Sequence, residues 1–145
     1  MKFVVHGAVV LSLLLGAAAV ADALVVTDQE RLDAFAEALS GVVEVDQIDE
    51  GLAYVDLEHE PLLLTTPDGE WEFGRGDGAD LGSRVRDALA PYMGSSVDEV
   101  QRSVEIDGEE ARVAVRLRTP EGLLNATFDL AKSGERWFVH RARLR

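Results

Sequence analysis

The stretch ARVAVRLRT at residues 111–119, the turn PEG at 120–122 and the stretch LLNATFDLA at 123–131 decide the fold class of this chain. Apolar and polar residues alternate along both stretches, and a period of two predicts β-strands that each turn one face toward a core. The alternation puts the valines and Phe128 on the buried face and the arginines on the opposite face. A short connection that contains glycine joins two such strands as an antiparallel hairpin. We therefore expect a half-buried antiparallel sheet in this part of the chain.

The neighbouring residues extend this hairpin into a four-strand meander. Val97 to Ile106 precedes it and is joined to it by Asp107-Gly108, a pair that favours a tight hairpin because both positions tolerate positive φ. Arg136 to Leu144 follows it after another turn that contains glycine. The alternation also puts two polar residues on the inner face, Arg102 in the first strand and His140 in the last. Their expected inward neighbours are Val100, Val104 and Ile106 in the first strand and Phe138, Ala142 and Leu144 in the last.

The residues before the meander predict three helices and a β-hairpin. Thr27-Asp28-Gln29-Glu30 is a capping box that starts a helix ending near Gly41, because its first and last side chains satisfy each other's backbone amides. A second, shorter helix is expected over Asp46 to Tyr54. Pro61 to Phe73 forms the hairpin around a proline–aspartate–glycine turn. The third helix is expected to start at an Asp80 cap.

This order of elements belongs to the α+β class, with three N-terminal helices and a β-hairpin packed on a curved antiparallel sheet that ends in the four-strand meander. Together with the closing phrase Ser133-Gly134-Glu135-Arg136-Trp137-Phe138-Val139, it resembles the nuclear transport factor two-like superfamily, also called SnoaL-like, over Thr27 to Arg145. The resemblance implies a cystatin-like α+β cone in which the curved sheet and the helices enclose a small pocket. It also implies a small-molecule binder, an isomerase or dehydratase, or a non-enzymatic partner protein, with dimerisation through the outer sheet face.

Residues 1–23 have the pattern of a secretory signal peptide. Lys2 is followed by the almost wholly apolar run from Val4 to Val20, and Ala21-Asp22-Ala23 is a small-x-small cleavage pattern. An uncleaved membrane anchor is the alternative, because the apolar run is close to the ~18 residues of a spanning helix. We expect cleavage, an exported protein in the periplasm or outside the cell, and one mature domain at residues 24–145. The chain has no cysteine, so no disulfide supports that domain.

The charge of the chain limits its partners. Its 14 basic and 27 acidic residues give a formal net charge of −13, which disfavours nucleic acid because phosphate binding needs basic surface. Between Leu24 and Glu109 the acids number 22 against five bases, whereas four acids and eight bases follow. The basic residues therefore gather in the predicted meander.

Polar residues on the inner face are the first candidates for function, because the resemblance implies a pocket there. Arg102, His140 and Tyr54 are the predicted ligand-pocket residues: an arginine can hold a carboxylate or phosphate, and a histidine can move protons near pH 7. Asp56 and Asp49 are the candidate carboxylate partners of His140 in a proton-transferring enzyme. The alternatives are a hydrogen-bonded core histidine and an arginine that extends to solvent at the pocket rim. The expected ligand is small and either apolar or anionic.

The outer face of the meander is the second candidate surface. Its arginines lie on two strands that flank a polar strand, and alternation puts Trp137 and Val139 beside them. Arginine and tryptophan are enriched where proteins bind proteins, so we expect a protein partner or a homodimer on this face, with a solvated face as the alternative. The predicted interface residues are Arg112, Arg116, Arg118, Trp137, Val139, Arg141 and Arg143.

No motif points to a metal or a cofactor. The run Glu58-His59-Glu60 does not form a metal site, because neighbouring side chains of an extended strand diverge. The run from Gly74 to Gly78 lacks the lysine and the serine or threonine of a phosphate-binding loop. The sequence thus predicts an exported, non-enzymatic binding or interaction module with a small cone-shaped pocket. An isomerase or dehydratase that uses His140 with a pocket carboxylate is the alternative.

Overall fold

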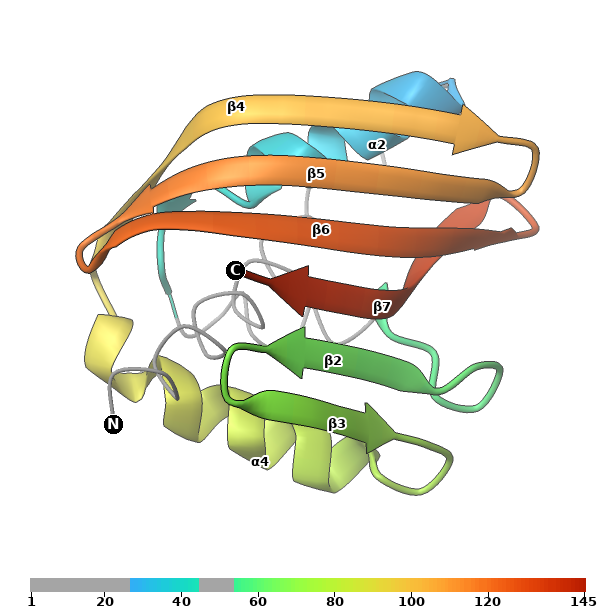
Figure 1. Cartoon of the computed structure of the whole chain (residues 1–145). Coiled ribbons are helices and arrows are strands. Elements are labelled where there is room, and N and C mark those ends of the chain that lie inside the picture. The colour runs from blue at the N-terminus through green and yellow to red at the C-terminus, as the bar shows by residue number, and fades with distance from the viewer. Residues whose placement is uncertain (1–26, 45–53) are drawn as a thin grey trace.

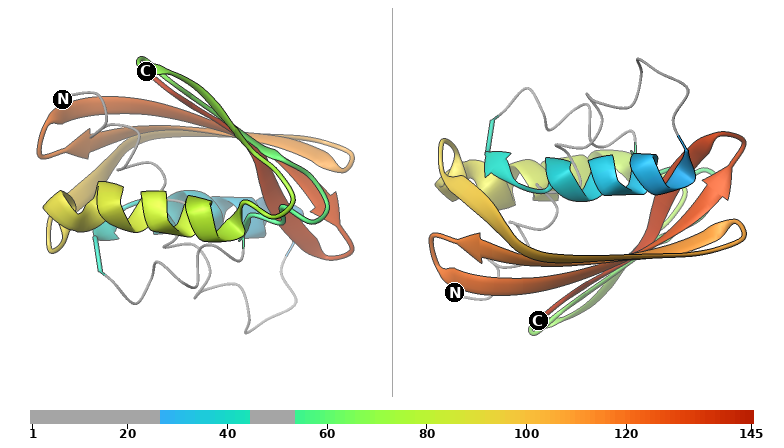
Figure 2. Two further views of the ribbon diagram at one scale, coloured as in Figure 1. Left: turned by 90° about the horizontal axis from the view of Figure 1, so that it is seen from below. Right: turned by 90° about the horizontal axis from the view of Figure 1, so that it is seen from above.

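The computed structural model describes residues 27–44 and 54–145, which form a curved, mixed β-sheet with helices on one side of it (Figure 1, Figure 2). The predicted signal peptide at 1–23 and the predicted second helix, apart from Tyr54, lie outside these residues. No helix of this described part is long and apolar enough to cross a membrane. The helical elements are α2 (Asp28–Ala38), α4 (Gly78–Leu89) and the short 3-10 helix η3 (Ala90–Tyr92). The strands are β1 (Gly41–Val42), β2 (Leu62–Thr66), β3 (Gly69–Phe73), β4 (Ser96–Asp107), β5 (Glu110–Thr119), β6 (Gly122–Ser133) and β7 (Arg136–Leu144).

The seven strands form one sheet in the order β1-β4-β5-β6-β7-β2-β3. The predicted antiparallel meander is confirmed as β4 to β7, and the predicted hairpin is confirmed as β2 and β3. The hairpin does not pack on the sheet as expected but joins it, because β2 pairs in parallel with β7 from Leu63–Arg141 to Thr65–Arg143. The prediction of a purely antiparallel sheet is therefore wrong. The parallel pairing satisfies the backbone groups of β7 that β6 leaves free.

The capping box starts α2 as predicted. The Thr27 amide donates to Glu30 Oε2 at 2.9 Å, and the Glu30 amide donates to Thr27 Oγ1 at 3.3 Å. Leu32, Phe35 and Leu39 are buried, so the apolar stripe of the helix faces the core. Figure 2 shows that α2 and α4 lie on the same side of the sheet.

The helix α4 begins earlier than predicted. It starts at Gly78, and Asp77 rather than Asp80 occupies the N-cap position. The Asp77 carboxylate accepts from the Gly74 amide at 2.7 Å and so closes the preceding loop, whereas Asp80 lies in the first turn and pairs with Arg84 at 3.0 Å. The sequence pattern points to the aspartate three positions farther along, because both aspartates precede the apolar stripe.

The inner faces of β5 and β6 are those predicted from alternation. Val113, Val115, Leu124 and Phe128 are all buried. Phe128 meets Phe35 of α2 edge to face with ring centroids 5.4 Å apart, so the aromatic contact joins the sheet to its helical cover.

A β-bulge in β7 reverses the predicted phase of its first half. Phe128 pairs with Ala142 but Leu130 pairs with Val139, so β7 has one residue more than β6 between these pairs. Trp137 and Val139 are consequently buried, with 5% and 2% of their surfaces exposed. The expectations that Trp137 and Val139 face outward and that Phe138 and His140 face inward are wrong. A prediction that assumes strict alternation cannot detect an inserted residue. The bulge lies next to His140, so it changes the face on which this residue lies.

A second irregularity occurs in β4, between Glu99 and Gln101. Val100 is the extra residue and is 48% exposed, so its predicted inward position is wrong. Arg102 lies opposite Val115 on the inner side, as predicted, and Val104 packs against the core. Ile106 is on the same side but 38% exposed, because the strand there runs beyond the helical cover.

Candidate functional site

The bulge in β7 places the His140 ring on the outer face of the sheet, at the end where β4 turns into β5. Nε2 lies 3.4 Å from Glu110 Oε2 of β5, and Nδ1 lies 3.9 Å from Glu60 Oε1 of the segment before β2. The side chain is 22% exposed, and its Nε2 atom is buried without a hydrogen-bond partner among the described residues. Buried polar atoms are normally satisfied, so this nitrogen is an exception that calls for a chemical explanation.

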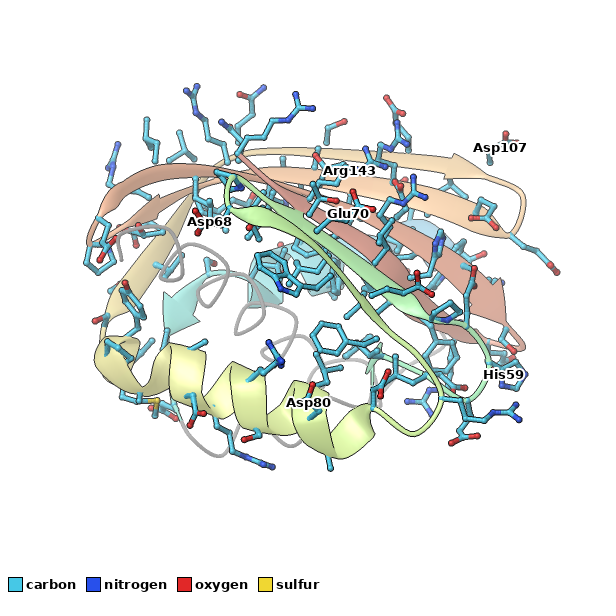
Figure 3. All side chains as sticks on the ribbon, turned by 60° about the horizontal axis from the view of Figure 1, so that its bottom comes forward. His59, Asp68, Glu70, Asp80, Asp107 and Arg143 are labelled. Atoms are coloured by element: carbon cyan, nitrogen blue, oxygen red, sulfur yellow. The ribbon has the colours of Figure 1, made fainter. Side chains whose placement is uncertain are left out.

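A hollow of about 530 Å³ lies beside Nε2 on this outer face. Its walls come from the β4–β5 hairpin, from β6 and from β7, and most of its charged groups are carboxylates. In Figure 3, Asp107 of this hairpin and His59 of the segment before β2 lie toward the same end of the molecule. The lining residues are Glu105, Ile106, Asp107, Glu110, Ala111, Arg112, Asp129 and His140.

Asp129 and Arg112 neutralise each other at the edge of this hollow. Arg112 Nε donates to Asp129 Oδ1 at 2.8 Å, and Arg143 of β7 donates to the other carboxylate oxygen. Burial alone would raise the pKa of Asp129, but the Arg112 hydrogen bond and the positive charges around it lower that pKa overall. The hydrogen bond to Asp129 also raises the pKa of Arg112. The other carboxylates that line the hollow therefore have no unpaired arginine beside them among its lining residues.

A smaller hollow of about 220 Å³ lies on the Nδ1 side of His140. Asp56 and His59 line it and form their own pair, with His59 Nδ1 3.2 Å from Asp56 Oδ2. Asp56 and His140 therefore line the same hollow, but Asp56 pairs with His59. The carboxylate nearest to His140 in this hollow is that of Glu60. The other predicted partner, Asp49, lies outside the described residues.

Arg102 does not line a pocket with His140. It forms a bidentate pair with Glu99 at 2.8 and 3.1 Å, donates to the Asp33 carbonyl at 3.2 Å and lies 3.6 Å from Glu37 Oε1. The hydrogen bonds to Glu99 raise the pKa of the Arg102 guanidinium, and the neighbouring acids of α2 raise it further. Arg102 therefore fastens α2 to β4, and three of its five N–H donors are used in these hydrogen bonds.

Tyr54 lies on the opposite side of the sheet from His140. Its ring packs on Phe35 at 5.9 Å between centroids, and burial raises its pKa. The three predicted pocket residues therefore lie in three separate places: Tyr54 packs against the core beside Phe35, Arg102 lies between β4 and α2, and His140 lies on the outer face.

The predicted interface residues also separate into groups. Trp137 is a core residue whose indole N–H donates to Asp28 Oδ1 at 3.2 Å, and Val139 is buried beside it. Arg112 and Arg143 are engaged by Asp129. Arg116, Arg118 and Arg141 are exposed on the outer face and have no ion pair within the described ranges.

Sequence reasoning missed Glu110 and Glu60, the two carboxylates nearest to the His140 ring. Neither has a characteristic spacing from His140, because they reach it from a different hairpin and from a different segment. A prediction that included the β7 bulge would have placed His140 on the outer face, where these two carboxylates lie. Among the described residues, no group of three or more histidine, aspartate or glutamate side chains is arranged to hold a metal ion.

No protein-family model matches the chain, and no curated protein is similar to it in sequence. Solved structures are similar in fold at low sequence identity. A protein of unknown function with a cystatin-like fold from Nostoc punctiforme PCC 73102 has a TM-score of 0.59 at 12% identity, over 83% of this chain and 93% of that chain. A protein of unknown function described as nuclear transport factor two-like, from Pseudomonas putida KT2440, has a TM-score of 0.52 at 15% identity, over 70% and 74%.

A third similar structure is a protein from Shewanella frigidimarina NCIMB 400 that is provisionally named as a ketosteroid isomerase. Its TM-score is 0.53 at 10% identity, over 68% of this chain and 80% of that chain. At identities this low, structural similarity establishes the arrangement of the elements. The chemistry of the site has to be argued from the residues of this chain. The chain has the nuclear transport factor two-like, cystatin-like fold that the order of its elements predicts.

Proposed function

We propose that this protein is an exported, non-enzymatic binding module that takes a small cationic ligand, a protonated amine, in the larger hollow beside His140. The observation that carries the proposal is the buried, unpartnered Nε2 of His140, which lies 3.4 Å from Glu110 in that hollow. Glu110 is 68% exposed, so a cation that binds its carboxylate in the hollow lies next to the His140 ring.

The charges around the hollow support a cation rather than the anion expected from the sequence. Glu105, Asp107 and Glu110 line it, whereas Arg112 is committed to Asp129. Ile106, which is 38% exposed at the end of the β4–β5 hairpin, adds apolar surface to the lining. An ammonium group on a short hydrocarbon chain fits both features, because the carboxylates accept its hydrogen bonds and the apolar surface covers its methylenes.

Isothermal titration with cadaverine, a five-carbon diamine, tests this function. Glu110→Gln removes a carboxylate from the hollow, and Glu109→Gln makes the same change one residue away, outside the hollow. We expect binding by the unmodified protein, a loss of about tenfold in affinity for Glu110→Gln and less than about threefold for Glu109→Gln. Absence of binding, or equal losses for the two variants, would overturn the proposal.

Export is supported by the pattern of residues 1–23. When the full chain is produced in a Gram-negative host, we expect a periplasmic protein whose mature N-terminus is Leu24. Mass spectrometry of the purified protein measures this directly. A full-length chain that stays with the membrane fraction would instead show an uncleaved anchor.

The geometry of His140 also favours a second candidate, an isomerase or dehydratase in which His140 transfers a proton. The ring lies within hydrogen-bonding reach of Glu110 through a small adjustment, and both groups line a hollow. Glu110 and Glu60 are 68% and 53% exposed, however, so water surrounds the carboxylates that an apolar site would tune. Conversion of a β,γ-unsaturated to an α,β-unsaturated ketone, followed by the absorbance of the conjugated product, tests this candidate. Turnover that His140→Gln abolishes would favour it over simple binding.

The outer face at the other end of the sheet supports the proposed protein partner or second copy. Arg116 and Arg118 have no ion pair within the described part of the chain, and Leu123 beside Arg118 is 50% exposed. With Trp137 buried, this contact would depend on arginine and not on an aromatic anchor. Sedimentation of the protein and of an Arg116→Glu, Arg118→Glu double variant measures it: a dimer that the double variant loses supports the contact, and a monomer at high concentration counts against self-association.

A further inference from the structure

We infer that His140 couples ligand binding in the larger hollow to loss of a proton, so that the protein releases its amine when the medium becomes acidic. This inference rests on the function proposed above and adds its regulation. It is carried by the position of the imidazole, which lines both hollows and lies close to one carboxylate of each, Glu110 of the larger and Glu60 of the smaller.

The two nitrogens of His140 face two carboxylates from different elements. Nε2 is 3.4 Å from Glu110 of β5, and Nδ1 is 3.9 Å from Glu60 of the segment before β2. A neutral imidazole has one N–H and one bare nitrogen, whereas a protonated imidazole has an N–H at both positions. Only the protonated ring can therefore donate to both carboxylates at once. In that state its N–H and its positive charge compete with an ammonium ligand for the Glu110 carboxylate.

The charged groups that surround the ring place the proton and the ligand in direct competition. On the side of the larger hollow the ring faces acids from β4, β5 and β6, and the one arginine there is already paired with Asp129. A proton on His140 adds a positive charge within this group and repels a second cation. The groups concerned are Glu105 and Asp107 of β4, Glu110 and Arg112 of β5, Asp129 and Lys132 of β6, Arg141 and Arg143 of β7, and Asp56, His59 and Glu60 of the segment before β2.

The sign of the coupling follows from this competition. Where the free protein carries the proton on His140, amine binding must expel it, so affinity rises with pH by up to about tenfold per pH unit. Where the ring is already neutral, affinity no longer changes with pH. Histidine side chains ordinarily change charge between about pH 5 and 8, which sets the range to be measured.

Titration calorimetry with cadaverine at about pH 5.5 and about pH 8 tests the inference. Measurements in two buffers of different ionisation enthalpy give the number of protons released. We expect affinity about tenfold higher at the upper pH and release of about one proton near the midpoint. His140→Gln should bind equally at both pH values and release none, whereas His59→Gln, the matched change in the smaller hollow, should behave like the unmodified protein.

A second measurement avoids any change of sequence. The ring protons of His140, followed by nuclear magnetic resonance, report its titration, and cadaverine should shift that titration to lower pH while leaving that of His59 in place. Failure of cadaverine to bind at any pH would contradict the proposed function itself. Binding with the same affinity at both pH values, or pH dependence that His59→Gln removes, would overturn this inference alone.

Discussion

At the scale of single residues, Asp129 is the charged group on which the outer face depends most. Its side chain is 14% exposed and lies between Arg112 and Arg143, which both donate to it. Asparagine at this position would leave two arginines side by side without a counter-charge. Removing one member of a partly buried ion pair is strongly unfavourable, because the remaining charges have already lost solvent.

We expect Asp129→Asn to lower the free energy of unfolding by about 1–3 kcal/mol at pH 7, measured by urea denaturation. The pKa of Asp129 is lowered in the folded protein from its usual 3.8, so its contribution is present above about pH 4 and disappears as the pH falls through the folded value. The control is Asp68→Asn at the exposed β2–β3 turn, which should change stability by less than about 0.5 kcal/mol. A loss for Asp129→Asn that stays the same at pH 2 would contradict the electrostatic explanation.

Tyr92 provides a prediction at alkaline pH. Its ring is buried and its hydroxyl donates to Glu121 Oε1 at 2.8 Å; burial first, and then the hydrogen bond and charge of Glu121, raise its pKa to about 12. In Tyr54→Phe, where Tyr92 is the remaining tyrosine, we expect ultraviolet absorbance to report ionisation near pH 12. Because the folded pKa is raised, the contribution of Tyr92 to stability is complete below about pH 10 and is lost as the pH rises toward 12. Ionisation near pH 10 in the folded protein would contradict the contact.

At the scale of elements, the bulge in β7 determines which side chains are core and which form the site. It adds one residue between the Phe128–Ala142 and Leu130–Val139 pairs. Deleting His140 would restore regular alternation and keep Trp137, Val139 and Ala142 inward. Deleting Phe138 would leave two arrangements. Either the bulge persists and Trp137 leaves its inward position, or the bulge is lost and Val139 turns outward.

We therefore expect the deletion of His140 to fold cooperatively, with a loss of less than about 2 kcal/mol. The deletion of Phe138 should lose more than about 3 kcal/mol or fail to fold, because a valine or tryptophan leaves the core. Thermal unfolding followed by circular dichroism compares the two. Equal stability of the two deletions would show that the bulge does not set the phase of the strand.

The elements also show where sequence reasoning succeeds. The start of α2 and the turns of the hairpins are local: Thr27 and Glu30 are three residues apart, and Asp107-Gly108 forms its turn within four residues. The faces of β5 and β6 follow from unbroken alternation. The faces of β7 and β4 were partly wrong because each contains one irregular position, and a single inserted residue leaves no compositional trace. The candidate site was mislocated for the same reason, since it depends on the side of the sheet that His140 faces.

At the scale of the whole molecule, the formal net charge of −13 opposes compactness. Added salt screens this repulsion and weakens exposed ion pairs such as Arg84–Asp80, which contribute little. We expect the midpoint of thermal unfolding to rise by about 3–6 °C between about 0.02 M and about 0.5 M sodium chloride, as measured by scanning calorimetry. A fall over this range would mean that attractive pairs, such as the group around Arg102, outweigh the repulsion.

The fold class and the order of elements were predictable because helices, hairpins and the meander are each encoded by neighbouring residues. The mixed sheet was not, because the pairing of Leu63 with Arg141 joins distant parts of the chain and has no local signature. The same limit applies to the group formed by Glu60, Glu110 and His140, which assembles only when three separate segments meet.

The place of β7 between β6 and β2 has a consequence for biosynthesis. A nascent chain that stops short of this strand exposes two open edges, one on the growing meander and one on the hairpin made some seventy residues before it. Native structure must wait until the ribosome has delivered the strand that joins them. Until β7 is made, the meander and the hairpin cannot join, and both of their open edges can pair with other chains.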